Sequence, residues 1–431
     1  MIAAAPCAQA PVADSAARRW DALAIAIRYA QSSAGPLCIS AAHFIAAFVF
    51  LRAFARTEFG ILSFLLVIVP FCLSLAGALI GVPAAIAVRH GAMGANELAT
   101  YLKMNLVLGA VAAISVFFMM CLSRAGWNFA IFSGAYGGIM TLRWFARTLT
   151  YARGPARSVL ISDILYAAAL SGGLVLLYRF HSLTPSGAVY LLFLSCLLAW
   201  LSFGRTYLRE QIAVAFTGSL AGYTRIWNEM ARWSAAGVVL TEFTANAHAY
   251  LVTFIAGPAA FAPLAVGTLL MRPVQLALAS IPDRERPAMA RLLGSGNYAG
   301  AVRSVNHFRI AAGAIWLLTA TTASGLLVWF PQLILRKAYD PAQALAVLAF
   351  FAAITAVRIF RTPESVLLQA AGEFRALAFA SLWSSFVSLA ATLALLLVAG
   401  PVFSLAGILF GEIVVTARVR RAARAWIESH A

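Results

Sequence analysis

Charged side chains are scarce in this chain of 431 residues. Only 11% of them are Asp, Glu, Lys or Arg, against about 25% in an ordinary soluble domain. Apolar residues make up 62% of the chain, and the mean hydropathy is +0.87. A soluble fold of this length could not hide that much apolar surface from water. The composition excludes a soluble enzyme, a disordered tail, collagen and a coiled coil, and it leaves a polytopic membrane protein.

Acidic residues are especially few, at 15 against 32 basic residues, which gives a net charge of +17. In a soluble chain this balance would suggest nucleic acid as a partner. In a membrane protein the arginines gather in the cytoplasmic loops instead. We therefore expect the lipid bilayer as a partner and no nucleic acid.

Cysteine patterns and enzyme motifs are also missing. The number of cysteines, five, is odd, and no CxxC motif occurs, so we expect neither a disulfide framework nor a metal site. No Walker loop, GxSxG nucleophile turn or HExxH zinc pair occurs. Residues 1–17 have neither the charged start nor the apolar run of a secretory signal. The sequence predicts no enzyme and no cofactor.

Long apolar runs recur at regular spacing, and a membrane-spanning helix needs about 20 residues. The runs predict an all-α membrane protein of about twelve transmembrane helices, in two six-helix lobes around a central cavity. The predicted spans are 34–54, 59–87, 105–123, 127–146, 158–180, 186–203, 236–256, 258–281, 310–330, 342–360, 376–399 and 401–417.

Basic residues test this division, because cytoplasmic loops are rich in Arg and Lys. With both termini in the cytoplasm, Arg272 lies inside a span and most other basic residues fall in cytoplasmic segments. Only six fall in segments predicted to lie outside: Arg52, Arg56, Arg124, Arg179, Arg336 and Lys337. The alternation supports an even number of spans.

The same division gives five segments. They are a cytoplasmic N-terminal segment (1–33), a six-helix lobe (34–203), a cytoplasmic linker (204–235), a second six-helix lobe (236–417) and a basic cytoplasmic tail (418–431). The outer loops are very short, which argues against a membrane polymerase or ligase with a large outer loop.

Polar residues inside spans are functional candidates, because they are costly in hydrocarbon. Glu242 and Asn246 share one face of span seven at helical spacing, with His248 on a second polar side. With Glu412 of span twelve, they are predicted to line the cavity or to couple transport to an ion; structural hydrogen bonding is the alternative. His43 is interpreted mainly as a packing residue. Asp163 is interpreted as a residue near the lipid headgroups.

Opposite charges at similar depth in adjacent helices relieve each other's desolvation. Spans seven and eight are joined by a very short turn, and they carry Glu242 and Arg272 at similar predicted depth. We therefore predict an ion pair between Glu242 and Arg272.

The segment after the first span carries Arg52 and then Glu58-Phe59-Gly60. It resembles polysaccharide flippases, in which an arginine ends the first span and Glu-Phe-Gly or Glu-Tyr-Gly opens the second. Where this chain has Ala55-Arg56, that family usually has Gly-Pro. Two later stretches are similar to the same family: the loop with Pro287, Leu292, Gly296, Tyr298 and Arg303, and the run from Leu367 to Arg375.

The resemblance is to the polysaccharide branch of the multidrug/oligosaccharidyl-lipid/polysaccharide (MOP) exporter superfamily. It implies a flippase in a bacterial inner membrane that moves an undecaprenyl-diphosphate-linked repeat unit for exopolysaccharide, capsule or O-antigen. Other polysaccharide-assembly proteins are the implied partners.

Arginine binds phosphate oxygens in pairs, so Arg28, Arg52 and Arg272 are the predicted substrate contacts. A cytoplasmic anchor is the alternative for Arg28, and an interfacial arginine for Arg52. A cation-coupled multidrug exporter of the same superfamily is the alternative function, and a membrane glycosyltransferase or polymerase is a weaker one.

Overall fold

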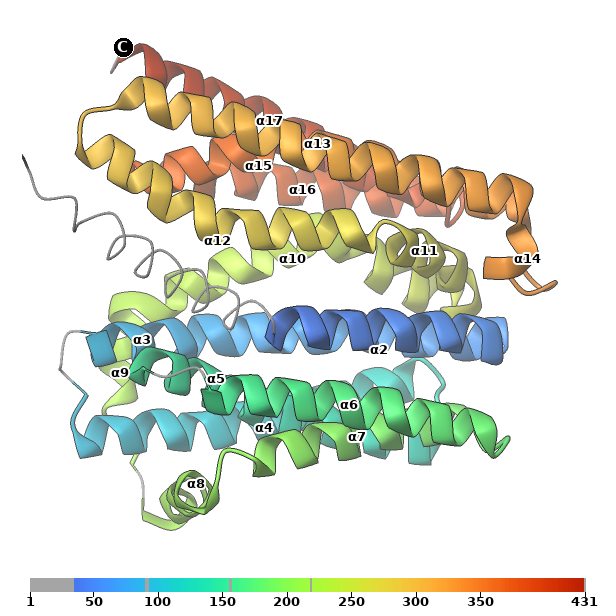
Figure 1. Ribbon diagram of the computed structural model, residues 1–431, viewed down its shortest axis with the longest axis horizontal. Helices are drawn as coiled ribbons and strands as arrows, with labels where there is room; N and C mark the ends of the chain where they lie inside the picture. The colour runs from blue at the N-terminus through green and yellow to red at the C-terminus, as the bar shows by residue number, and fades with distance from the viewer. Residues whose placement is uncertain (1–34, 90–92, 155–156, 218, 430–431) are drawn as a thin grey trace, which may run out of the picture.

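The computed structural model describes residues 35–89, 93–154, 157–217 and 219–429, and every regular element in these ranges is a helix (Figure 1). The first lobe contains a helix at Gly35–Ala53 and then α2 (Arg56–Ala76), η1 (Gly77–Gly81), α3 (Val82–Arg89), α4 (Ala95–Leu122), α5 (Trp127–Arg153), α6 (Arg157–Arg179) and α7 (Pro185–Leu201). The elements α2, η1 and α3 form one long rod, which a π-helical turn interrupts.

The second lobe begins with another long rod, made of α9 (Tyr223–Ile226), η2 (Trp227–Ala231), α10 (Arg232–Leu251) and η3 (Val252–Ala256). It continues with α11 (Pro258–Leu270), α12 (Arg272–Gly294), α13 (Tyr298–Trp329), α14 (Pro331–Ile334), α15 (Pro341–Ala370), α16 (Phe374–Ala399) and α17 (Ser404–Glu428). The helices α11 and α12 meet at a bend of 56°.

Eight helices in the described ranges are long and apolar enough to cross a membrane, and two bent pairs raise that number to ten. The helices α5 and α17, of 27 and 25 residues, occupy the places of the two remaining predicted spans. Both carry several arginines. The predicted fold class, an all-α polytopic protein with two lobes of helices, is confirmed.

Local sequence explains where several helices begin. Thr184 accepts a hydrogen bond from the Gly187 amide at the start of α7, and a proline follows it. Asp340 caps α15 in the same way, again before a proline. An oxygen-bearing cap followed by proline is a strong start signal, because proline needs no hydrogen bond in the first turn.

The segment expected as a linker, 204–235, is largely helical. Its first helix, α8 (Arg205–Thr217), turns by 104° from α7. Gln211 fixes α8 to α4, accepting a hydrogen bond from Asn105 at 2.9 Å and donating one to the Leu102 carbonyl at 2.8 Å. From Tyr223 onward the segment is already part of the rod that contains α10.

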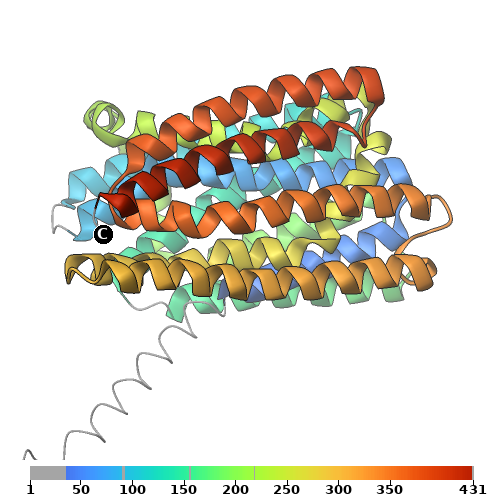
Figure 2. The same ribbon diagram turned by 90° about the horizontal axis from the view of Figure 1, so that it is seen from above.

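The two lobes lie as two layers of near-parallel helices (Figures 1 and 2). Helix α2 of the first lobe packs against α11 of the second. This contact lies near the start of α2, at the end that the charge pattern predicts to be outside; we call it the predicted outer end.

Gly60 makes that approach possible. A Cβ atom at Gly60 would lie 2.0 Å from the Pro258 carbonyl oxygen, so the helices meet backbone to backbone. Gly257, at φ +88°, turns the chain into α11 with a conformation that glycine adopts without strain.

Replacing Gly60 with alanine should separate the lobes at the predicted outer end and lower the thermal unfolding midpoint. The facing atom belongs to the backbone and cannot swing aside. Gly77→Ala is the matched control, because no atom lies within 4 Å of a Cβ there. Equal midpoints for the two variants in detergent would contradict this view of the contact.

Candidate functional site

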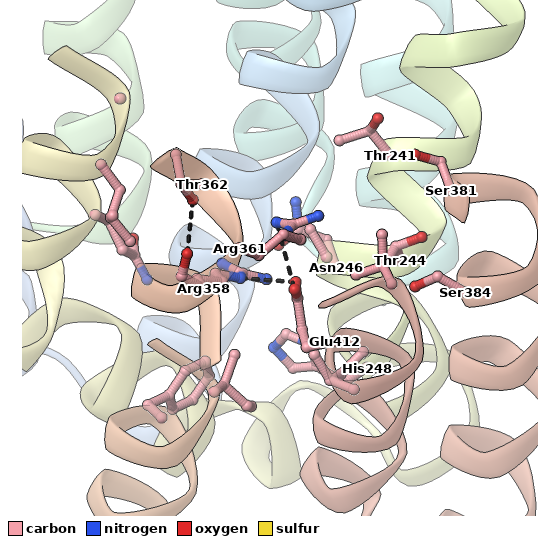
Figure 3. A pocket seen from close by; sticks show the side chains of 18 of the residues that line it. Thr241, Thr244, Asn246, His248, Arg358, Arg361, Thr362, Ser381, Ser384 and Glu412 are labelled. Carbon is pink, nitrogen blue, oxygen red and sulfur yellow. Dashed lines mark hydrogen bonds and ion pairs between the residues drawn. The ribbon is translucent and has the colours of Figure 1, made fainter. Parts of the chain in front are cut away.

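A cavity of about 450 Å³ lies inside the second lobe. It is lined by α10, α11, α12, α15, α16 and α17, and Figure 3 shows polar side chains from several of them pointing into it. The lining includes Thr241, Thr244, Asn246, His248, Gln275, Arg358, Arg361, Ser384 and Glu412. The structure thus brings together three of the predicted site residues, Asn246, His248 and Glu412.

Glu412 is the acidic centre of this cavity and is only 1% exposed. Arg358 Nε donates to its Oε1 at 2.7 Å, and Arg361 approaches Oε2 at 3.3 Å (Figure 3). Two guanidinium groups thus surround one carboxylate, so the cluster carries one positive charge in excess.

His248 lies in the same cavity, on α10, and packs against the ring of Phe351. The described residues provide no hydrogen-bond partner for its Nδ1 atom, although that atom is buried. Buried polar atoms are nearly always hydrogen-bonded. The Nδ1 atom therefore favours a polar occupant of the cavity.

A second buried cluster of charges lies in the first lobe. Asp163 of α6 is fully buried and accepts hydrogen bonds from Arg143 at 2.6 Å and Arg147 at 2.8 Å, both on α5. Ser162 accepts a third bond, from Arg143 Nε. The sequence predicts Asp163 near the lipid headgroups, but the structure places it inside the protein, paired with two arginines. This cluster again contains one arginine in excess.

A hydrogen-bonded chain lies beside that cluster. His43 Nε2 and the Tyr166 hydroxyl are 2.7 Å apart, and the Tyr166 and Tyr136 hydroxyls are 3.3 Å apart. The Arg143 guanidinium lies over the Tyr166 ring. His43 thus belongs to a polar network in the core of the first lobe.

Arg272 begins α12, at the bend that follows α11. Its half-buried side chain lies close enough to His43 and Tyr136 for its positive charge to act on both groups. A residue of the second lobe therefore directs its charge toward the first. No hydrogen bond or ion pair with another described residue occupies its guanidinium.

The predicted ion pair between Glu242 and Arg272 is wrong. The Glu242 carboxylate accepts hydrogen bonds from Asn246 Nδ2 at 3.1 Å and from the Tyr250 hydroxyl at 2.8 Å. All three residues are on the rod that contains α10, so the helix satisfies its own carboxylate with neutral donors. Depth and adjacency suggested the pair, but Arg272 faces the other lobe.

The remaining predicted substrate contacts lie elsewhere. Arg52, at the end of the first described helix, donates to the Leu333 carbonyl at 2.8 Å at the predicted outer end, and it does not line the cavity of the second lobe. Arg28 lies outside the described residues. Glu58 of the resemblance motif accepts from the Ala55 amide and caps α2.

The sequence pattern did not single out the four arginines that hold the two carboxylates. Arg143 and Arg147 are one turn apart on α5, and Arg358 and Arg361 are one turn apart on α15. The predicted topology assigns all four arginines to cytoplasmic segments. The available signal was their one-turn spacing at the end of an apolar helix, which puts both members of a pair on one face.

No protein-family profile and no curated protein matches this chain. Solved structures do match over nearly its full length. One is an inward-facing conformation of a multidrug resistance MATE family transporter of the MOP superfamily, with TM-score 0.66 and 14% identity over 91% of this chain and 95% of that one. An outward-facing MATE structure gives TM-score 0.61 and 13% identity, over 92% and 94%.

A third match is a MOP superfamily transporter from Pyrococcus furiosus Vc1, described by a reverse polarity of its binding pocket that suggests a different function. Its TM-score is 0.58 at 13% identity, over 92% of this chain and 93% of that one. The chain therefore has the fold of MOP superfamily transporters, as the resemblance implied. The polysaccharide branch gains no support from these structures.

Proposed function

We propose that this protein is an alternating-access membrane transporter whose substrates are anionic amphiphilic molecules. The fold it shares with multidrug transporters supports the exporter alternative over the lipid-linked oligosaccharide flippase. The charge of the buried groups then decides the kind of substrate. The observation that carries the proposal is Arg272, a half-buried guanidinium that makes no hydrogen bond or ion pair with the residues the structure describes and lies near His43 of the other lobe.

The buried acids argue against a cationic substrate. Asp163 and Glu412 are each held by two arginines. A cationic drug would have to displace those arginines and would leave them unpaired, which is strongly unfavourable in a low-dielectric interior. An anion meets an available guanidinium at Arg272 and an excess of positive charge in each lobe. The reverse pocket polarity attributed to the Pyrococcus furiosus protein supports the idea that this fold tolerates such a change.

Glu242 is the candidate coupling residue. Its carboxylate lies on the long rod that contains α10 and has hydrogen bonds from two neutral donors, and it forms no ion pair with a described residue. Such a carboxylate can take up and release a proton without breaking an ion pair. We infer that a proton or a cation gradient acts on transport at this position.

Glu242→Gln should fold normally and lose the dependence of transport on a pH gradient. The glutamine oxygen can still accept the hydrogen bond from Asn246, and its amide group can donate to the Tyr250 hydroxyl oxygen, but glutamine cannot titrate. Glu97→Gln, at an ion pair near the surface, is the control and should keep the dependence. Transport by Glu242→Gln that still rises with the imposed gradient, measured in proteoliposomes, would rule out this coupling site.

The proposed function itself is tested with purified protein in proteoliposomes. A fluorescent anionic amphiphile and a cationic dye of similar size are compared in parallel. We expect transport of the anion and little of the cation. Faster transport of the cationic dye, insensitive to substitution of Arg272, would overturn the proposal.

A lipid-linked oligosaccharide diphosphate is the second candidate substrate, since arginine suits diphosphate oxygens. It is an anionic amphiphile too, and one further measurement separates it from small molecules. If this is the substrate, deleting the gene should make lipid-linked repeat units accumulate and stop surface polysaccharide export. Normal export in a deletion strain without a redundant carrier would exclude this substrate.

A further inference from the structure

A second cavity, of about 690 Å³, lies at the predicted outer end and is lined from both lobes. The first lobe contributes Arg52, Ala55 and Arg56, and the second contributes Gln332 and the residues from Leu335 to Ala338. Four cationic side chains border this cavity: Arg52, Arg56, Arg336 and Lys337. They are four of the six basic residues predicted to lie outside, so the scarce outer cations are gathered at one place.

Hydrogen bonds to backbone carbonyls hold three of these arginines across the boundary between the lobes. Arg52 reaches the Leu333 carbonyl, and Arg336 returns the contact to the carbonyls of Ala53 at 3.1 Å and Phe54 at 2.9 Å. Arg56 Nε donates to the Ala259 carbonyl at 2.9 Å. The cavity is therefore assembled only when the lobes meet at this end.

The two nearby carboxylates, of Glu58 and Asp340, do not pair with the four cationic side chains of this cavity. Glu58 is occupied as the cap of α2, and Asp340 accepts from the amides of Ala342 and Gln343 at the start of α15. No ion pair within the described residues joins either acid to the cations around the cavity. Each arginine has five N–H donors, and the carbonyl bonds use only some of them. Lys337 makes no hydrogen bond to a described residue.

We propose that this cavity binds a phosphate-type anion, which holds the two lobes together at the predicted outer end. Guanidinium groups bind phosphate oxygens in parallel pairs, and an ammonium adds a further point charge. Because both lobes supply the cations, a bound anion favours the conformation in which they touch, and it is lost when they separate. The anion has two chemical sources: a free phosphate compound in solution, or the headgroup of a lipid in the adjacent leaflet.

The test uses the full-length protein in nanodiscs of phosphatidylcholine, with inorganic pyrophosphate as the probe. Pyrophosphate should raise the thermal unfolding midpoint above that in sodium chloride of equal ionic strength. Lys337→Glu should weaken this effect by about tenfold in pyrophosphate concentration or more, as the loss of a charge-assisted contact predicts. This side chain is exposed and makes no hydrogen bond within the described part of the chain, so the variant should fold. A variant with both Arg124→Gln and Arg179→Gln, the two outer arginines that do not line the cavity, is the matched control and should respond as the wild type does.

A second set of nanodiscs, containing phosphatidylglycerol, distinguishes the sources. If stabilisation appears there without pyrophosphate and depends on Lys337, the anion is a lipid headgroup; if it needs pyrophosphate in both membranes, the anion is free phosphate. Spin labels at Ser182 and Phe403, in a cysteine-free background, should show a narrower distance distribution across the predicted outer end when the anion is present. An equal response from Lys337→Glu and the control, or no response to either anion source, overturns the proposal.

Discussion

Replacing Arg272 with alanine should lower transport of an anionic substrate by about 10- to 100-fold while leaving expression unchanged. A hydrogen bond to a charged group contributes about 1.5–3 kcal/mol, and each 1.4 kcal/mol corresponds to about a tenfold change in binding. Arg272 forms no ion pair with a residue of the described ranges, so its removal leaves no charge of those residues without a partner.

Lysine at position 272 should recover part of the activity, because an ammonium keeps the charge but cannot make the paired contact of a guanidinium. Arg286→Ala is the matched control, since Arg286 is on the same helix with an exposed side chain. Proteoliposome transport, normalised to protein content, provides the comparison. Wild-type rates for Arg272→Ala would remove Arg272 from the site.

Substituting Asp163 with alanine should destabilise the protein by about 3–5 kcal/mol, which is the usual cost of leaving a buried charge without its partner. Two guanidinium groups, from Arg143 and Arg147, would then face a vacant position inside the first lobe. Glu97→Ala is the control, because its partner Arg225 is 71% exposed, and exposed ion pairs contribute about 1 kcal/mol or less.

The measurement is the unfolding midpoint of each variant in detergent. Replacing Arg143, Arg147 and Asp163 together with apolar residues of similar volume should restore much of the lost stability, because no charge is then left alone. A midpoint for Asp163→Ala close to that of Glu97→Ala would show that the cluster stabilises the fold far less than its burial suggests.

The sequence predicted the helical membrane fold well, because apolar runs and the distribution of arginines report directly on the bilayer. The site residues on α10 were predicted for a similar reason. A helix that carries Asn246 and His248 among apolar residues cannot face lipid, and both residues do line the cavity of the second lobe.

The interaction partner of a polar side chain was harder to predict than its position along a helix. Glu242 and Arg272 are close in sequence and in expected depth, but rotation of a helix about its axis decides which way each side chain points, and hydropathy does not report that rotation. The same difficulty hid the arginines of α5 and α15. An arginine at the end of a span has the same sequence context whether it reaches the headgroups or turns inward to a carboxylate such as Glu412.

The two charged clusters occupy related places in the two lobes. Each lobe carries an arginine pair on its fourth long helix, Arg143 with Arg147 and Arg358 with Arg361, and a histidine on its first, His43 or His248. The acids differ, since Asp163 comes from α6 and Glu412 from α17. The arginine pairs and the histidines therefore recur at matching places in the two lobes.

This arrangement bears on what it costs the molecule to move. Within the described ranges, the buried ion pairs of Asp163 and Glu412 each join helices of a single lobe. The polar contacts that cross between the lobes at the predicted outer end are mostly hydrogen bonds from Arg52, Arg56 and Arg336 to backbone carbonyls. Water can replace such bonds on both sides when the lobes part. The lobe movement that the proposed transport requires would therefore leave the ion pairs of Asp163 and Glu412 intact, and it would break only polar contacts that water can replace.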